Sequence, residues 1–175
     1  TNPGVYLVNS NGENKPELLF KDGTNPRFMG NDKIFFQVDE GESKSYKVFD
    51  LNKKTTTTVF TSKYATSVVP SPDGKWVAFI ELFKAYVCAF PETGKPVDLS
   101  AGMSNVPIAQ LTKDAGLNLH WSADSKRIHW TYSDEYFTNE LKNRFTFLDG
   151  SPTKVPPIDT VGIKIGLDLP MDKPS

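Results

Sequence analysis

The sequence predicts an all-β fold built from repeated, four-stranded antiparallel sheets. Three observations lead to this prediction. Short apolar strands alternate with turns rich in Gly, Asn and Asp along the whole chain. The turn positions Gly12, Lys53 and Gly94 are evenly spaced, because 53 − 12 and 94 − 53 both equal 41. No window shows the 3.6-residue apolar period of an amphipathic helix.

The first repeating unit is a strand, a turn and a second strand. Its first strands are Val5–Asn9, Tyr46–Asp50, Tyr86–Phe90 and Arg144–Leu148; its turns are 11–12, 52–53, 93–94 and 149–150; its second strands are Glu17–Phe20, Thr57–Phe60, Val97–Leu99 and Lys154–Val155. Polar turn residues between β-branched or aromatic runs are typical of hairpins.

A second unit, a short strand, a tight turn and an apolar strand, lies between successive copies of the first. Its copies are Val69–Phe79, His120–Trp130 and a degenerate Arg27–Phe36. In such turns Pro sets φ, Asp accepts hydrogen bonds from its own backbone, and Gly tolerates a positive φ. We therefore interpret Asp73 and Asp124 as turn formers and not as a catalytic carboxylate pair.

Together the two units give four strands per roughly 40 residues, the period of a β-propeller blade. The count predicts a partial propeller of about three and a half blades: a half blade at 1–24, blades at about 25–61, 65–100 and 117–158, and a C-terminal strand and linker at 159–175 towards a missing domain. Propellers usually close with about four to eight blades. We expect other chain segments, another copy or an unusual closure to complete the arc.

Two segments interrupt the pattern. Residues 101–116 lengthen the spacing between two successive repeats and are predicted to form an insertion between blades. The segment Ser133–Lys142 is predicted to be a strand-connecting loop. Aromatic residues fall at equivalent places in the repeats and are expected to pack between blades. These are Phe28, Phe36, Phe79, Trp121 and Trp130.

Composition narrows the function classes. The chain has 175 residues and a net charge of −1, so no basic field favours nucleic acid. It contains neither a signal peptide nor the roughly 20-residue apolar run of a membrane span. It opens at Thr1 without Met, which suggests a processed chain or a piece of a longer one. The single Cys88 lies in an apolar run and is predicted to be a buried thiol.

No catalytic, cofactor-binding or metal-binding set can be assigned from the residues. His120 and His129 could approach across a hairpin, but a metal site usually has three or four ligands, so we expect these rings to pack beside Trp121 and Trp130. The segment Asp134, Glu135 and Tyr136 is the candidate interaction loop, with a solvated loop as the alternative.

Several motifs resemble a known family. Ser71–Lys75, a Ser-Pro-Asp-Gly-Lys run before a strand, resembles the repeat of TolB-like and tricorn-like propellers. The stretches Ile108–Lys113, Leu119–Asp124 and Ile128–Trp130 and the tail Val161–Ser175 resemble the propeller and linker of exported bacterial metal-dependent amidohydrolases. The likeness spans residues 25–175, and the chain departs from the pattern at Met29–Lys33.

The resemblance implies a non-catalytic propeller module of a larger amidohydrolase-like protein, serving as scaffold, substrate-access or interaction surface. Two alternatives stay open: a stand-alone propeller that binds peptides or proteins, and a part that lines the substrate path of a hydrolase whose active site lies elsewhere. The resemblance also implies export to the periplasm, no cofactor in this chain, and Zn or another divalent metal in the hydrolase domain. Expected partners are the missing blades and that domain, or further copies through apolar blade faces, with no nucleic acid and no membrane span.

Overall fold

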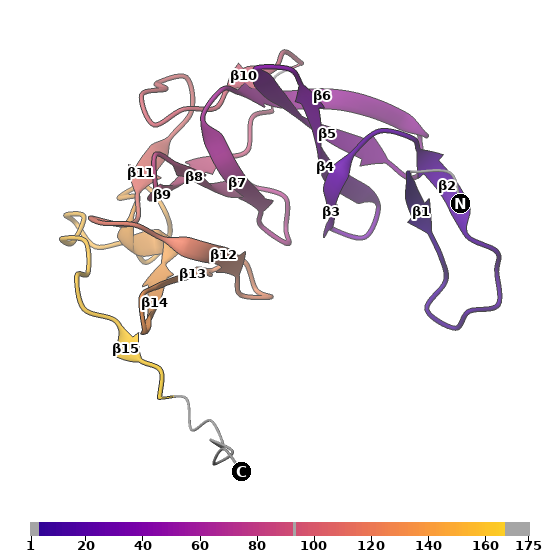
Figure 1. Cartoon of the computed structure of the whole chain (residues 1–175). Helices are drawn as coiled ribbons and strands as arrows, with labels where there is room; N and C mark the ends of the chain where they lie inside the picture. Colours follow the sequence, from indigo (N-terminus) through magenta and orange to yellow (C-terminus); the bar gives the residue numbers. More distant parts are fainter. Residues whose placement is uncertain (1–3, 93, 167–175) are drawn as a thin grey trace, which may run out of the picture.

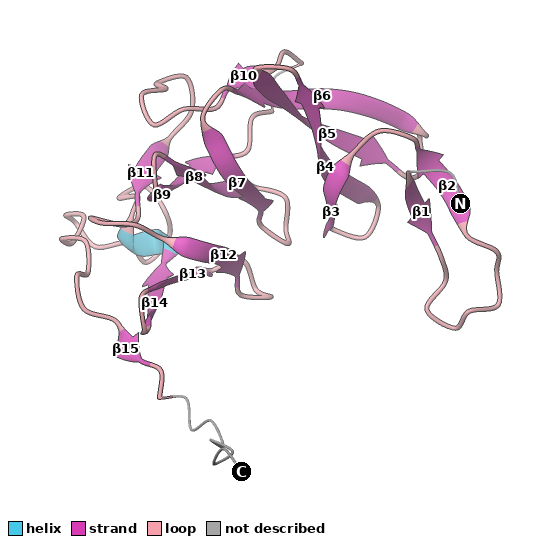
Figure 2. Ribbon diagram, viewed as in Figure 1, coloured by secondary structure: helices cyan, strands magenta, loops and turns pink. Residues whose placement is uncertain are grey.

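The computed structural model describes residues 4–92 and 94–166, which form β-strands, turns and one short 3₁₀ helix, η1 (Leu141–Asn143). The strands make four sheets that follow one another round an open arc, with β1 and β15 at opposite ends (Figures 1 and 2). The all-β prediction is confirmed. Thr93, in a predicted turn, and the end of the tail from residue 167 lie outside the described residues.

Sequential strands pair within each sheet, except that β10 joins β6 and β11 joins β9 out of sequence order. The half sheet holds β1 (Val5–Leu7) and β2 (Glu17–Phe20). The first full sheet holds β3 (Thr24–Met29), β4 (Lys33–Glu40), β5 (Ser43–Asp50), β6 (Thr55–Ser62) and β10 (Val97–Asp98). The second holds β7 (Ala65–Pro70), β8 (Trp76–Glu81), β9 (Lys84–Ala89) and β11 (Ile108–Gln110); the third holds β12 (Leu117–Trp121), β13 (Arg127–Tyr132), β14 (Glu135–Glu140) and β15 (Ile163–Lys164).

Strand β8 shows how neighbouring sheets share a core, because all six of its residues are buried. Successive side chains of a strand point to opposite faces. Val77 and Phe79 pack towards the first sheet in one apolar cluster, whereas Trp76, Ala78 and Ile80 pack towards the third sheet in another. A strand covered on both faces needs a continuous apolar run, which is the pattern seen in the sequence.

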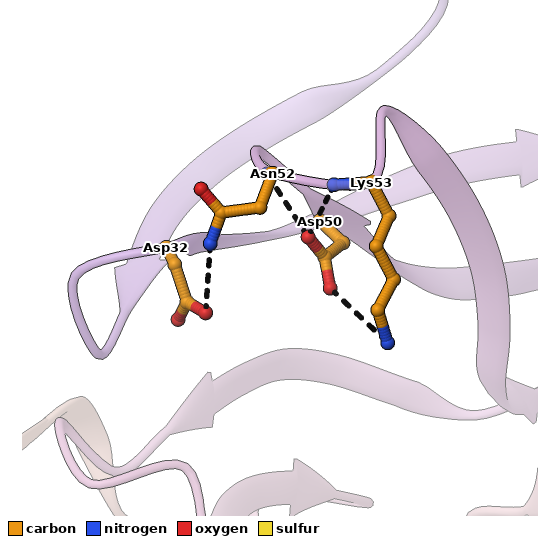
Figure 3. A network of polar contacts seen from close by, with 4 residues as sticks. All are labelled: Asp32, Asp50, Asn52 and Lys53. Carbon is orange, nitrogen blue, oxygen red and sulfur yellow. Dashed lines mark hydrogen bonds and ion pairs between the residues drawn. The ribbon is translucent and has the colours of Figure 1, made fainter.

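Turn chemistry fixes the hairpin ends, as the β5–β6 turn illustrates (Figure 3). The carboxylate of Asp50 accepts backbone N–H bonds from Asn52 (3.0 Å) and Lys53 (2.9 Å). The Lys53 N–H bond, followed by the bond from Asn52, holds the pKa of Asp50 below its usual value. Asn52 also reaches Asp32 in the β3–β4 turn (3.5 Å), so two turns of one sheet are tied together.

The outer edge of the second sheet differs from the prediction. Val97–Leu99 was expected to be its fourth strand, but β10 pairs in parallel with β6 of the first sheet, with Val97 opposite Phe60. Val97 and Leu99 are thereby buried between the first and second sheets. Ile108–Gln110, within the presumed insertion, pairs with β9 instead. Residues 101–116 therefore contribute a strand and are not merely a connection between blades.

The third sheet also differs from the prediction. Ser133–Lys142 was expected to be a loop, but it contains β14 and most of η1. Arg144–Leu148 and Lys154–Val155 were expected to be strands, but the chain turns there and the outer strand is β15. Burial explains the misreading, because Arg144 and Phe145 are buried outside the sheet, and Phe145 packs on Trp76 with ring centroids 4.8 Å apart.

The two-residue turn between β8 and β9 is strained. Leu82 and Phe83 have φ of 47° and 71°, and their side chains are 69% and 75% exposed. Two positive φ angles favour Asn-Gly, because a Cβ crowds the backbone in this region. Replacing Leu82→Asn together with Phe83→Gly is expected to raise the free energy of unfolding by about 1–2 kcal/mol. Urea denaturation measures the change in the free energy of unfolding. A double variant less stable than the original chain would show that the turn is not strained.

Candidate functional site

The inner strands β3, β7 and β12 enclose the first candidate site, here called the inner-strand groove. Its volume is about 340 Å³. The lining residues are Arg27, Phe28, Val69, Pro70, Pro72, His120 and Trp121. They come from all three full sheets, whose inner strands lie on the concave side of the arc (Figure 1).

Hydrogen bonds between sheets hold the walls of the inner-strand groove. The indole N–H of Trp121 donates to the carbonyl of Val69 (3.0 Å), which joins the third sheet to the second. The backbone N–H of Gly30 donates to the carbonyl of Pro72 (2.8 Å), which joins the first sheet to the second. The groove is therefore preformed by the fold, because each wall is bonded to its neighbour.

Phe28 and Arg27 give the groove its chemistry. The sequence predicted that Phe28 packs between blades, but 60% of its side chain is exposed; Phe36, Phe79 and Trp130 are buried and Trp121 is half-buried. The half sheet lies against another part of the first sheet, where Phe20 stacks on Phe36 at 4.0 Å. Arg27 is also exposed. An exposed aromatic ring beside a guanidinium group is typical of interaction surfaces.

A second cluster, the histidine face, consists of His120, His129 and Tyr136 on the outer face of the third sheet. His120 lies directly opposite His129 on paired strands, and their rings stack with centroids 5.0 Å apart. Tyr136 lies 5.9 Å from the His120 ring and 5.6 Å from the His129 ring. The expected packing beside Trp121 and Trp130 is wrong, because adjacent residues of a strand point to opposite faces.

Hydrogen bonds orient both imidazoles. Nδ1–H of His120 donates to the carbonyl of Asn118 (2.9 Å), which leaves Nε2 of the neutral ring to accept the Tyr136 hydroxyl (3.2 Å). Nδ1 of His129 shares a hydrogen bond of 2.8 Å with the Thr138 hydroxyl. Burial, followed by electrostatic interaction with His120 and Arg127, lowers the pKa of His129, so this ring is neutral at neutral pH.

The histidine face makes one exposed end of the arc more polar than the sequence predicted. Apolar faces were expected at both ends of the arc, yet this end carries two imidazoles and a phenol. The half sheet at the other end does expose Tyr6, Val8 and Leu18. Self-association through apolar faces therefore stays a prediction for the half-sheet end alone.

The predicted interaction loop does not form one site. Asp134 lies in the β13–β14 turn, where its carboxylate is 3.9 Å from the Lys164 amine. Glu135 and Tyr136 belong to β14, and Tyr136 turns to the histidine face. Only Tyr136 of the three joins a cluster. The strand period would have revealed this if the segment had been interpreted as a strand.

A larger cavity of about 630 Å³ lies between two turns and the segment that follows β14. The carboxylates of its turns are engaged locally. Asp73 accepts bonds from the Ser71 hydroxyl (2.6 Å) and the Lys75 backbone (3.1 Å). Asp124 accepts equivalent bonds from Ser122 (2.5 Å) and Lys126 (3.1 Å). Both aspartates are turn formers, as predicted.

Cys88 is fully buried, and burial raises the pKa of its thiol to about 12, so a reactive thiolate does not form. Among residues 4–92 and 94–166, no group of three or more His, Cys, Asp or Glu side chains could hold a metal ion. In the same ranges no helix is long and apolar enough to cross a membrane.

Comparison with known proteins supports the fold. TolB from Acinetobacter baumannii superimposes with a TM-score of 0.55 and 20% identity over 83% of this chain and 38% of TolB. The chain is a partial β-propeller. This propeller also matches the β-propeller domain of the Trilobed protease from Pyrococcus furiosus, described as having an open velcro topology (TM-score 0.48, 13% identity, 70% of this chain and 40% of that one).

A third solved structure, an uncharacterized protein from Listeria monocytogenes, matches with a TM-score of 0.41 and 14% identity over 61% of this chain and 33% of that one. The propeller thus spans about two-fifths or less of the chains it matches. No family model matches the sequence, and no curated protein matches it. At these identities the likeness establishes a TolB-like propeller fold and nothing finer.

Proposed function

We propose that this chain is a non-catalytic, TolB-like propeller module of a larger protein, and that its inner-strand groove binds a polypeptide segment. The observation that carries the proposal is the exposure of Phe28, 60% of whose side chain is accessible in a groove shared by three sheets. Aromatic and arginine side chains dominate the energetics of protein interfaces, and Phe28 and Arg27 supply both.

The shape and charge of the groove favour an extended, acidic segment. A volume of about 340 Å³ suits a few side chains more than a folded domain. Arg27 supplies a cation for a carboxylate at one wall of the groove. The apolar walls formed by Val69, Pro70 and Trp121 favour an aliphatic or aromatic side chain beside that carboxylate.

The identity of the larger protein follows only from the motif resemblance. On that proposal the propeller lies beside a metal-dependent amidohydrolase domain, which would contribute its own ligands and its Zn or other divalent ion. The complete protein would be exported to the periplasm. The isolated chain should then lack hydrolase activity, while the peptide-binding role of the groove holds with or without the hydrolase domain.

Selection from a random-peptide display library on the immobilised chain tests the groove. Acidic peptides with an aromatic or aliphatic residue should be enriched, and F28S should weaken their binding at least tenfold, about 1.4 kcal/mol. R27Q should weaken acidic peptides more than neutral ones. F147S is the matched control, because Phe147 is 62% exposed and lies outside the groove. Enriched peptides that bind F28S as tightly as the original chain, or an unenriched library, would refute the proposal.

A further inference from the structure

The two histidines of this sequence are its only imidazoles, and the fold brings them face to face. His120 on β12 and His129 on β13 are direct cross-strand partners, with ring planes 18° apart. The separation of the ring centroids is 5.0 Å, so modest side-chain rotations bring a nitrogen of each ring to one ion. Two imidazoles on a rigid sheet can therefore act as one bidentate ligand.

The hydrogen bonds of the histidine face leave the correct nitrogens for a metal. The Asn118 carbonyl holds the Nδ1–H of His120, and the Thr138 hydroxyl engages Nδ1 of His129. Partners of this kind fix the tautomer and the orientation of metal-binding histidines. Nε2 of His120 meets only the Tyr136 hydroxyl, which an ion could displace or recruit as an oxygen donor. No described residue hydrogen-bonds Nε2 of His129.

The donor set selects the class of ion. Imidazole nitrogens suit copper, nickel and zinc, whereas magnesium and calcium require oxygen ligands. Two nitrogens with a phenol oxygen and water match the tetragonal preference of Cu²⁺, which also leads the affinity order of divalent first-row ions. A closed structural zinc site would need four protein ligands, which the histidine face does not supply.

We propose that His120 and His129 form a bidentate site for a divalent transition-metal ion, with Cu²⁺ bound most tightly. The site occupies the outer face of the third sheet; His120 also lines the inner-strand groove, but Cu²⁺ binding is measured without peptide and does not require the polypeptide-binding proposal to hold. Arg127 lies two residues before His129 on the same face of β13, and its charge opposes a bound cation. The affinity for the metal ion therefore comes from chelation by the two imidazoles and not from an acidic surface.

Titration of the full chain with Cu²⁺, followed by tryptophan fluorescence and electron paramagnetic resonance, tests the site. One ion per chain should quench the fluorescence of Trp121 and Trp130, which are the sequence neighbours of His120 and His129. The electron paramagnetic resonance spectrum should show two coordinated imidazole nitrogens. H120Q and H129Q should each weaken binding at least tenfold, because the second ligand of a chelate binds at a high effective concentration. The double variant should lose little more than either single variant.

Tyr136→Phe keeps the ring and removes the phenol, so it should weaken Cu²⁺ binding by less than either histidine variant. Tyr132→Phe is its matched control, because Tyr132 is exposed and outside the histidine face. Two Cu²⁺ ions bound weakly and independently, each lost with one histidine, would overturn the proposal. A Cu²⁺ affinity that is unchanged in H120Q and H129Q would also overturn it. If either variant unfolds, a spectrum of the unaltered chain with a single coordinated nitrogen would overturn it equally.

Discussion

Replacing Phe79→Ala is expected to lower the free energy of unfolding by about 3–5 kcal/mol. Phe79 is fully buried, and it lies in the apolar cluster between the first and second sheets with Phe35 and Tyr46. Its removal leaves a cavity at the junction that holds two blades together. Urea denaturation followed by circular dichroism measures the loss, which is large compared with the stability of a typical domain.

The matched control for Phe79 is Phe147→Ala, because Phe147 is 62% exposed. This change should alter stability by less than about 0.5 kcal/mol, as is usual for exposed positions. If Phe79→Ala lowered the free energy of unfolding no more than Phe147→Ala, the first and second sheets would not share a core.

Replacing Arg144→Ala is also expected to have a large effect and to lower the free energy of unfolding by about 2–3 kcal/mol. The guanidinium group is buried, and its N–H groups donate to the carbonyls of Pro156 (2.8 Å) and Pro157 (3.4 Å). Burial lowers the pKa of Arg144 below its usual value, so the side chain occupies a costly position; these bonds offset part of that cost, while its buried Nε has no hydrogen-bond partner among the described residues. Without the guanidinium group, the segment between η1 and β15 loses the bonds that join its start at Arg144 to Pro156 and Pro157 near its end.

Limited proteolysis and urea denaturation together test this role. The Arg144→Ala variant should be cleaved faster between residues 145 and 160, while the first sheet keeps its protection. Arg127→Ala is the control, since Arg127 is exposed on β13. Equal cleavage rates in the two variants would show that Arg144 does not fasten the segment.

Much of the fold could be predicted because blade strands have strong local signals. Residues 76–81 form a continuous apolar run, which only a strand covered on both faces explains, and the structure buries all of them. Turn chemistry was equally informative, since Asp73 and Asp124 make the hydrogen bonds expected from the Pro-Asp-Gly and Ala-Asp-Ser turns.

The outer strands could not be predicted, because their pairing depends on tertiary contacts. Val97–Leu99 and Ile108–Gln110 are both short and apolar, so either could pair with β9. Burial decides the outcome, since Val97 and Leu99 fill the junction beside Phe60. In the same way Arg144–Leu148 resembles a strand, but Phe145 is used to cover Trp76.

The candidate sites escaped prediction for related reasons. Tyr136 could be placed beside the histidines only once β14 was recognised as a strand, because its face follows from the two-residue period. Phe28 occupies the same repeat position as residues that pack between blades. Its exposure depends on which neighbouring strands cover it, and that information is not local to its own repeat.

The contacts between sheets distinguish separate blades from one continuous barrel, and nuclear Overhauser effects can measure them in a chain of 19.5 kDa. Separate blades should give effects between the rings of Phe60 and Phe90, whose centroids are 5.5 Å apart, and from the Trp121 indole proton to Val69. No effects of backbone pairing are expected between β6 and β7, which belong to different sheets. Effects that join β6 to β7 as paired strands of one continuous barrel would contradict separate blades.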